Sequence, residues 1–362
     1  MGQIKVAIII PSLSHGGAER VASSLANHWV KNEDLDVYVY NFSVLPKFYQ
    51  LSTDVKYINF PISQKAGLFE LIKLSLSIRR SIRKSGIHAV LSFMDKYNVF
   101  VRLITLGTGV RVTLSDRSNP FRPLGRGLKW LKRMTYPFAD GVIAQTELAA
   151  GEIKRSTGAR QIVVIPNPVR IPDGAMTEAR ERVLLSVGRL VAEKGHADLI
   201  RAFAIAGMSD WELFILGEGP LKHELQALAD SLGVGRQVHF PGAMKDVHRW
   251  YGRASIFGFC SHSEGFPNAL SEAMASGLPC VSYNCNAGPS ELIEHQASGY
   301  LVPVGDIKGA AHWLKLLSLD RPLRTKVGGR ARDAVRRLNP HAIAHKYLVA
   351  CLGPELIVGL DR

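Results

Sequence analysis

Short β-branched apolar runs alternate along the chain with longer stretches whose apolar residues recur at helical spacing. Strands of this kind, separated by helices, are typical of parallel sheets that helices cover on both faces. The expected strands are 4–10, 36–42, 55–60, 87–93, 111–115, 141–145, 162–165, 182–188, 211–217, 237–240, 255–260, 279–283 and 300–302. The expected helices include 17–31, 66–85, 195–207, 219–232 and 306–318.

The alternation is interrupted once, at 166–174, where three prolines in seven residues can continue neither a strand nor a helix. A chain of 362 residues also exceeds what one core usually fills. We therefore predict an α/β protein of two doubly wound, Rossmann-like domains that face each other across a cleft. The expected domains are 1–168 and 169–340, and residues 341–362 are expected to form a helix that packs back toward the first domain.

Positive charge is concentrated in the first half of the chain. Residues 1–170 carry 24 Lys and Arg against 11 Asp and Glu, whereas residues 171–362 carry 21 against 20. This asymmetry predicts an anionic partner for the first domain only. Two basic amphipathic segments, 68–84 and 122–133, fit the surface of an anionic membrane. Alternatively, these segments are helices that are solvated on one face and packed on the other. Their cations are Lys73, Arg79, Arg80, Arg83, Lys84, Arg122, Arg126, Lys129, Lys132 and Arg133.

Other global features favour a cytoplasmic protein. No apolar run reaches the roughly 18–20 residues of a membrane span, and the short run 4–10 resembles a buried strand rather than a signal peptide. The cysteines show no metal-binding or paired spacing and are expected to be reduced, mostly buried thiols. They are Cys260, Cys280, Cys285 and Cys351.

The most informative motif is a pair of carboxylates, Glu264 and Glu272, on either side of a Gly-Phe-Pro turn. If a helix begins near Pro267, both acids flank its N-terminus, where free backbone N–H groups attract phosphate. Such a site suits a sugar nucleotide, which has hydroxyl groups at both ends and a diphosphate between them. The alternative is a surface acid followed by an acid that the helix dipole favours.

Two further motifs follow predicted strand ends. Arg189 and Lys194 come after strand 182–188 and could clamp a diphosphate, although such cations are more often solvated. Gly16 and Gly17 come after the first strand and permit a tight turn or a close approach to phosphate. The glycines do not form the dinucleotide fingerprint G-x-G-x-x-G, which disfavours a dehydrogenase.

Taken together, these motifs, with 217–220 (Gly-Glu-Gly-Pro) between them, resemble glycosyltransferase family 4. The likeness spans about residues 4–350. It implies the GT-B fold, with two Rossmann-like domains, and retaining chemistry. Segments 12–20 and 115–120 resemble those of bacterial members that build lipid-linked oligosaccharides, capsules or lipopolysaccharide. Examples are N-acetylgalactosamine transferases of polyprenyl-diphosphate glycan assembly.

The resemblance also implies roles for individual residues. Arg189 and Lys194 would bind the donor diphosphate, Glu272 the ribose and Glu264 the donor sugar. Glu264, Arg189 and Lys194 are thus the catalytic candidates. The remaining donor-binding candidates are Gly16 and Gly17 near the diphosphate, the turn residues Gly265, Phe266, Pro267 and Asn268, and Gly242 and Met244 near the base.

One departure concerns a histidine that many relatives place beside the donor sugar. The corresponding stretch here, 115–117, is Ser-Asp-Arg. Asp116 and Arg117 are therefore acceptor-side candidates, as are His15 and Asp95. No metal-ligand cluster is evident in the sequence, so no metal or cofactor is expected.

We interpret the chain as a retaining glycosyltransferase that moves a hexose or N-acetylhexosamine from a nucleotide sugar, expected to be UDP-linked, to a lipid-linked saccharide. It would work in the cytoplasm at the inner face of the membrane. One alternative is a non-hydrolysing UDP-sugar epimerase on a similar scaffold. A basic nucleic-acid-binding protein is a weaker alternative, since no recognition motif is present and the cations avoid the second domain.

Overall fold

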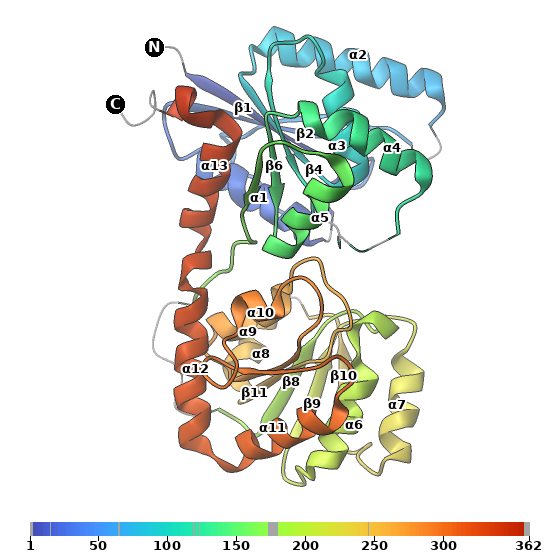
Figure 1. Cartoon of the computed structure of the whole chain (residues 1–362), viewed down its shortest axis with the longest axis vertical. Coiled ribbons are helices and arrows are strands. Elements are labelled where there is room, and N and C mark those ends of the chain that lie inside the picture. The colour runs from blue at the N-terminus through green and yellow to red at the C-terminus, as the bar shows by residue number, and fades with distance from the viewer. Residues whose placement is uncertain are drawn as a thin grey trace. The chain divides into compact units, whose positions relative to one another are not determined.

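A computed structural model describes residues 3–14, 16–63, 66–117, 119, 121, 123–172, 180–244 and 246–357, without the side chains of 354 and 355. The chain divides into two compact units. The first unit contains residues 1–168 and 340–362, and the second contains residues 169–339. Each unit is an α/β sandwich built around one parallel sheet, and each is described separately (Figure 1).

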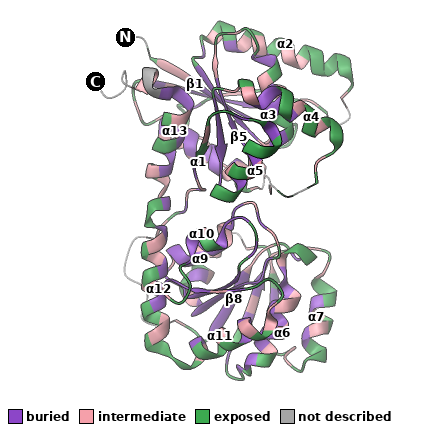
Figure 2. Ribbon diagram, in the orientation of Figure 1, coloured by how far each residue is buried: buried purple, intermediate pink, exposed green. Residues whose placement is uncertain are grey.

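The first unit is built on a seven-stranded sheet in the order β3-β2-β1-β4-β5-β6-β7, with every neighbouring pair parallel. Its strands are β1 (Ile4–Ile10), β2 (Leu35–Asn41), β3 (Lys56–Asn59), β4 (Ala89–Phe93), β5 (Arg111–Ser115), β6 (Gly141–Ala144) and β7 (Ile162–Val164). The central strands are buried along their length because helices cover both faces of the sheet (Figure 2).

Two helical layers cover this sheet. The helices are α1 (Gly17–Trp29), α2 (Leu68–Ser85), α3 (Asp95–Ile104), α4 (Arg126–Thr135), α5 (Glu147–Thr157) and α13 (Pro340–Ile357), with a short 3-10 helix, η1 (Tyr136–Phe138). Helices α2, α3, α4 and α5 share one core with the sheet, and α1 and α13 share the core on the opposite face. The C-terminal helix α13 is thus an integral part of the first unit.

The second unit has a six-stranded parallel sheet in the order β10-β9-β8-β11-β12-β13. Its strands are β8 (Val183–Val187), β9 (Glu212–Leu216), β10 (Val238–Gly242), β11 (Ile256–Phe259), β12 (Cys280–Tyr283) and β13 (Tyr300–Val302). Its helices are η2 (Ala192–Lys194), α6 (His196–Ala206), α7 (Lys222–Ser231), α8 (Val247–Arg253), α9 (Asn268–Ala275), α10 (Pro289–Leu292), α11 (Ile307–Leu319), α12 (Arg321–Val335) and η3 (Arg336–Leu338). Helices α6, α7 and α11 cover one face of the sheet, and α8 and α9 cover the other.

The predicted architecture of two doubly wound domains is confirmed, and each expected strand is present with ends within two residues of the prediction. Segment 122–133 is helical from Arg126 onward, and residue 122 lies outside the described residues. The residues before Arg126 include Pro123 and Gly125, which disfavour a helix interior. Residues 173–174 of the proline-rich linker lie outside the described residues.

Candidate functional site

In the second unit the strand order reverses between β8 and β11, which are neighbours in the sheet although far apart in sequence. Open parallel sheets bind ligands beyond the carboxyl ends of the strands at such a reversal. The two loops at this point are 188–195, which carries Arg189 and Lys194, and 260–267, which carries Glu264. The topology therefore brings three predicted site residues to one edge of the sheet.

Close backbone contacts hold these loops together. Gly195 has a φ of +62° and lies against the carbonyl of Cys260, so a side chain at 195 would collide with that backbone. The His262 N–H donates to the Glu193 carbonyl at 2.8 Å, which joins the loops directly. Similarly, Gly288, with a φ of +131°, leaves room for the ring of Pro267. These glycines are needed because the loops approach at backbone distance.

The central contact of the site joins Lys194 and Glu264. The Nζ of Lys194 lies 2.6 Å from Oε1 of Glu264, and the carboxylate is largely buried. The side chain of Arg189 is exposed beside the same strand end. The two cations can bind an anionic group, and the buried acid beside them can accept a hydrogen bond from a neighbouring hydroxyl group.

Helix α9 begins beside this pair, as predicted, with Pro267 at its N-cap and no acid in its first turn. The Phe266 side chain is buried in the core beneath the loop, and Pro267 has no amide hydrogen to donate. The Asn268 amide donates to the Phe266 carbonyl at 2.9 Å. Side chains 266 and 267 therefore shape the turn. In the first turn of α9 the Ser271 amide donates to the Pro267 carbonyl at 3.0 Å, so the amides of Ala269 and Leu270 are the ones that could meet an anion.

Glu272 lies one turn into α9, where it accepts a hydrogen bond from the Tyr251 hydroxyl at 3.2 Å. The same hydroxyl donates to the Ala269 carbonyl at 3.3 Å. Because Tyr251 is buried in α8, it fixes the Glu272 carboxylate relative to the start of α9. This orientation suits an acid that accepts hydrogen bonds from neighbouring hydroxyl groups of a ligand.

Of the two predicted base-binding residues, Gly242 is the last residue of β10 and Met244 lies in the loop that follows. Gly242 has a φ of +88°, and its carbonyl accepts a hydrogen bond from the Gly217 amide at 2.9 Å. Met244 is partly buried against the core under α8 and α9. Both residues lie at the carboxyl edge of the same sheet as Lys194 and Glu264.

Sequence reasoning missed His196, the first residue of α6, because nothing in its spacing marks it as part of the site. Its ring is buried, with Nε2 in contact with Gly188 and with Lys194 nearby. Burial lowers its pKa to about 4. Hydrogen bonding to the backbone of Arg189 and Gly188 acts in the opposite direction and raises the pKa, but by less. The neutral imidazole thus supports the loop that carries Arg189.

This burial predicts an acid-sensitive second unit. Because an unfolded His196 titrates near its ordinary pKa of 6.5, the unfolded state binds the proton first as pH falls. We expect stability to decrease by about 3 kcal/mol between pH 6.5 and pH 4. Denaturation of the His196→Asn variant should lack this portion of the pH dependence. The prediction would be contradicted if the free energy of unfolding fell equally steeply with pH in the variant and in the wild type.

In the first unit, Gly16 is the N-cap of α1 and Gly17 its first residue. The carboxylate of Glu19 lies against Gly16 and accepts a hydrogen bond from the Ser12 hydroxyl at 3.0 Å. Glu19 stands at the third helical position, where acids commonly fold back onto the preceding loop, and this pattern could have identified it from the sequence. His15 lies outside the described residues.

The acceptor-side candidates Asp95 and Asp116 come together on one buried lysine. The Nζ of Lys132 lies 2.6 Å from Oδ2 of Asp116 and 3.4 Å from Oδ2 of Asp95. The Tyr136 hydroxyl donates to Asp116 at 3.1 Å. Burial opposes ionisation of Asp116, but the hydrogen bond with Asp95 and the charge of Lys132 outweigh it and lower the pKa. This cluster joins α3, α4 and the end of β5.

Other candidates in this unit have structural contacts. Arg117 donates to the Tyr347 hydroxyl at 2.9 Å and to Asn167, which links the β5 end to α13. Asp95 begins α3 directly after Met94, whose φ of +74° is rare for a residue with a side chain. Backbone strain of this kind is common at functional sites.

The prediction that Lys132 and Arg79 face a membrane was wrong. Lys132 is buried in the cluster with Asp95 and Asp116. Arg79 donates to the carbonyls of Ile104 and Leu106 at 2.8 and 2.6 Å, and so holds the end of α3. Lys132 points toward protein because Asp116 after β5 and Asp95 of α3 bind it, and Arg79 does so because the carbonyls at and just after the end of α3 accept its hydrogen bonds.

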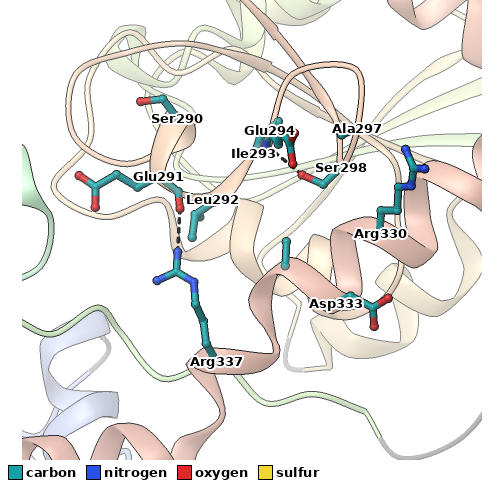
Figure 3. A pocket seen from close by; sticks show the side chains of 11 residues that line it. Ser290, Glu291, Leu292, Ile293, Glu294, Ala297, Ser298, Arg330, Asp333 and Arg337 are labelled. Atoms are coloured by element: carbon teal, nitrogen blue, oxygen red, sulfur yellow. Dashed lines mark hydrogen bonds between the residues drawn. The ribbon is translucent and has the colours of Figure 1, made fainter.

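A separate pocket of about 820 Å³ lies in the second unit between α10, the following loop and α12 (Figure 3). Arg337 closes one side by donating to the Glu291 carbonyl at 2.7 Å. Its charged lining residues, Glu291, Glu294, Arg330, Asp333 and Arg337, carry both signs, and it contains none of the predicted site residues. Within the described residues, no three His, Cys, Asp or Glu side chains could together hold a metal ion.

Two family models together match most of the chain. Residues 15–171 match the model described as Glycosyltransferase Family 4, and residues 175–334 match Glycosyl transferases group 1. The chain belongs to glycosyltransferase family 4. It is therefore a glycosyltransferase, as the motifs predicted. None of the helices in the described ranges is long and apolar enough to cross a membrane.

Similar proteins agree with this assignment. Two Campylobacter jejuni relatives resemble this family 4 chain over nearly its whole length. One, a GalNAc-alpha-(1->4)-GalNAc-alpha-(1->3)-diNAcBac-PP-undecaprenol alpha-1,4-N-acetyl-D-galactosaminyltransferase, is 25% identical over 95% of this chain and 97% of its own. The other, an N-acetylgalactosamine-N,N'-diacetylbacillosaminyl-diphospho-undecaprenol 4-alpha-N-acetylgalactosaminyltransferase, is 26% identical over 96% of this chain and 100% of its own.

A solved structure shares the fold. HepE from Anabaena, in complex with UDP and glucose, has a TM-score of 0.77 and 18% identity over 99% of this chain and 100% of its own. The likeness supports the GT-B fold predicted from the sequence.

Proposed function

We propose that this glycosyltransferase moves a hexose or N-acetylhexosamine from a UDP-linked donor to a lipid-linked saccharide, with retention of anomeric configuration, at the cytoplasmic face of the membrane. The observation that carries the proposal is the Lys194–Glu264 pair at the strand-order reversal of the second unit. The pair lies in the loops beside the start of α9, which leads to Glu272.

The donor would contact several groups along the carboxyl edge of the second sheet. Arg189 and Lys194 bind the diphosphate together with the first-turn amides of α9. Glu264 accepts hydrogen bonds from the sugar, and Glu272, held by Tyr251, accepts them from the ribose. Gly242 and Met244 lie where the base is expected, and HepE, a protein of the same fold, binds UDP.

The proposed reaction breaks the bond between the anomeric carbon and the diphosphate oxygen. The acceptor hydroxyl attacks from the same face and forms the new glycosidic bond, and its proton passes to the departing phosphate oxygen. Charge develops on that diphosphate, where Arg189, Lys194 and the α9 amides stabilise it. We propose that these groups suffice without a metal ion or another cofactor.

The acceptor class is proposed from the relatives and from charge. Both C. jejuni relatives are named for undecaprenol-linked diphosphate saccharides. The first half of this chain, which forms most of the first unit, has a strong excess of Lys and Arg. Such a unit suits an anionic acceptor at a membrane, and no nucleic-acid partner is proposed.

The proposal is tested by incubating the protein with a panel of UDP- and GDP-sugars, with and without polyprenyl-diphosphate saccharides. We expect one UDP-sugar to be consumed rapidly only with an acceptor, at a rate that EDTA does not change. The Glu272→Ala variant should raise KM for that donor by about 10- to 100-fold, because a charged hydrogen-bond acceptor is lost.

Tyr251→Phe is the matched variant, because it removes only the hydroxyl that orients Glu272 and should have a smaller effect. Conversion of a UDP-sugar to a different UDP-sugar without acceptor would instead indicate an epimerase. An unchanged KM for Glu272→Ala would remove the ribose assignment.

A further inference from the structure

A cavity of about 810 Å³ opens at the amino edge of the sheet in the first unit. Some of its lining residues stand at or directly before the starts of β4, β5, β6 and β7, and the others come from α3, the loop after it, η1 and α13. Open parallel sheets bind their substrates beyond the carboxyl ends of the strands, where Gly16 and Asp116 lie in this unit. The cavity is therefore at the opposite edge from the expected substrate site, and its volume is that of a site for a small organic ligand.

Arg111 brings an unpaired positive charge to this cavity. It is the first residue of β5, it is partly exposed, and its Nε is buried with no hydrogen-bond partner among the described residues. The guanidinium group lies against the backbone of Gly353, where a Cβ atom would come within 2.7 Å of Cζ. Gly353 has a φ of +73° and interrupts α13, so the end of that helix turns at the guanidinium group. The exposed part of the group is left for a ligand.

No acid in the described part of the chain neutralises this charge. Neither Arg111 nor Arg102, the second arginine of the lining, forms an ion pair with a described residue. Asp140 also lines the cavity, but its Oδ2 accepts a hydrogen bond from the Val112 amide at 2.8 Å. The Nε of Arg102 donates to the Phe138 carbonyl at 2.9 Å, which fixes the guanidinium group at the cavity wall. Two positioned cations give the cavity a positive potential.

Neutral hydrogen-bond donors extend the polar lining. The Nδ1 of His88 accepts a hydrogen bond from the Lys5 amide at 2.9 Å, so the neutral ring carries its proton on Nε2. Gln161 stands directly before β7 and is exposed, and its side-chain amide can donate two hydrogen bonds. A lining that combines guanidinium groups with N–H donors suits a phosphate or a carboxylate.

The remaining lining is apolar. Phe138, in η1, is 61% exposed. Leu352 and Leu356 of α13 also line the cavity, as do Ile87 and Val110. An exposed aromatic ring beside aliphatic side chains provides a surface for the flat or aliphatic part of a ligand.

The loop between α3 and β5 is held in its shape without a ligand. Gly107 and Gly109 have φ values of +65° and +75°, which residues with a Cβ atom rarely adopt. Arg79 donates to two backbone carbonyls at the start of this loop, and the Thr108 hydroxyl donates to a third at 2.7 Å. A wall that is already ordered lowers the entropic cost of binding.

We propose that this cavity binds a small organic anion with a phosphate or carboxylate head and an aromatic or aliphatic body. The head contacts Arg111 and Arg102, and the body packs against Phe138 and the leucines of α13. The site goes beyond the proposed function, because the donor loops lie at the carboxyl edge of the second sheet. Because Gly353 and Leu356 line the cavity, the bound anion also ties the end of α13 to the first sheet.

The test is calorimetric titration of the whole chain with phenyl phosphate, phenylacetate and inorganic phosphate. We expect one of the two aromatic anions, which identifies the preferred head, to bind at least about tenfold more tightly than inorganic phosphate. Arg111→Gln should weaken this binding by at least about tenfold, and Phe138→Ala by about three- to tenfold. Arg111→Lys keeps the charge without the planar fork and should be intermediate. Arg336→Gln, which changes an exposed arginine of the second unit, is the matched control and should bind as the wild type does.

Two further measurements locate the bound anion. Lys194→Gln alters the proposed donor site and should leave the affinity unchanged, and the ligand should slow hydrogen exchange severalfold in 105–111 and 351–357. Phe138 is exposed, so its variant tests the site even if Arg111→Gln lowers stability.

The site would be overturned if neither aromatic anion bound, or if inorganic phosphate bound as tightly as both. It would also be overturned if Lys194→Gln abolished binding, or if Arg111→Gln and Phe138→Ala both bound as the wild type does. Sugar transfer is measured separately. Binding of an aromatic anion by a protein without transferase activity would support the cavity site and count against the proposed function alone.

Discussion

The Lys194→Gln variant is expected to lower kcat/KM for donor and acceptor by about 10²- to 10³-fold. Glutamine keeps a hydrogen-bond donor for the buried Glu264 carboxylate, whose Oε1 lies 2.6 Å from the lysine Nζ. It removes the positive charge that the departing diphosphate would require. The loss should therefore be in transfer rate, measured as UDP release, and the thermal unfolding midpoint should change little.

A double-mutant cycle shows whether the two residues act together. Glu264→Gln and Lys194→Gln should be strongly non-additive if both contact the same donor, since either change disrupts one arrangement. Lys326→Gln, which changes an exposed lysine of α12, is the matched control and should retain full turnover. Near-normal turnover of Lys194→Gln would remove this residue from the donor site.

The largest expected effect on stability belongs to Lys132. Replacing it with methionine should lower the free energy of unfolding of the first unit by about 3–5 kcal/mol, because the buried Asp95–Asp116 pair loses its cation. In the wild type, the lowered pKa of Asp116 means that its ionised form stabilises the fold at pH values above the ordinary carboxyl pKa. This contribution is lost as the pH falls through the lowered pKa. Denaturation followed by hydrogen exchange in β4 and β5 measures the difference.

The neighbouring lysine of α4 gives the matched comparison. Lys129 is exposed, so Lys129→Met should change stability only slightly. The triple variant Lys132→Met/Asp95→Asn/Asp116→Asn should regain much of the lost stability, because no buried charge is left unpaired. If Lys132→Met and Lys129→Met unfolded alike, the buried cluster would have no energetic role.

The sheets could be predicted from the sequence because their central strands are buried on both faces. Runs such as 4–10 and 111–115 are mostly apolar or β-branched and are followed by Pro11 and Asp116, which disfavour strands, so pattern and structure agree closely. The start of α9 was predictable for a related reason, because Pro267 favours a helix N-terminus. Local chemistry specified these elements without knowledge of distant contacts.

Side-chain orientation was predicted less well. Helical spacing identifies an amphipathic helix, but it does not reveal an acid that a cation meets from another element. Lys132 meets Asp116, which lies 16 residues earlier, and Arg79 meets carbonyls at the end of α3. His196 gave no signal at all, because its burial depends on the approach of the Gly188 loop.

Helix α13 has a consequence for how the polypeptide matures. Buried side chains of α13, among them Tyr347, Leu348, Cys351 and Leu352, complete a core whose residues outside this helix all lie before position 168. On the ribosome, α1 alone covers this face of the first sheet, which remains partly uncovered until the whole second unit has been synthesised. The second unit is one uninterrupted segment and can fold as soon as it emerges. We therefore expect nascent chains that stall within α12 to be captured by chaperones through their N-terminal halves.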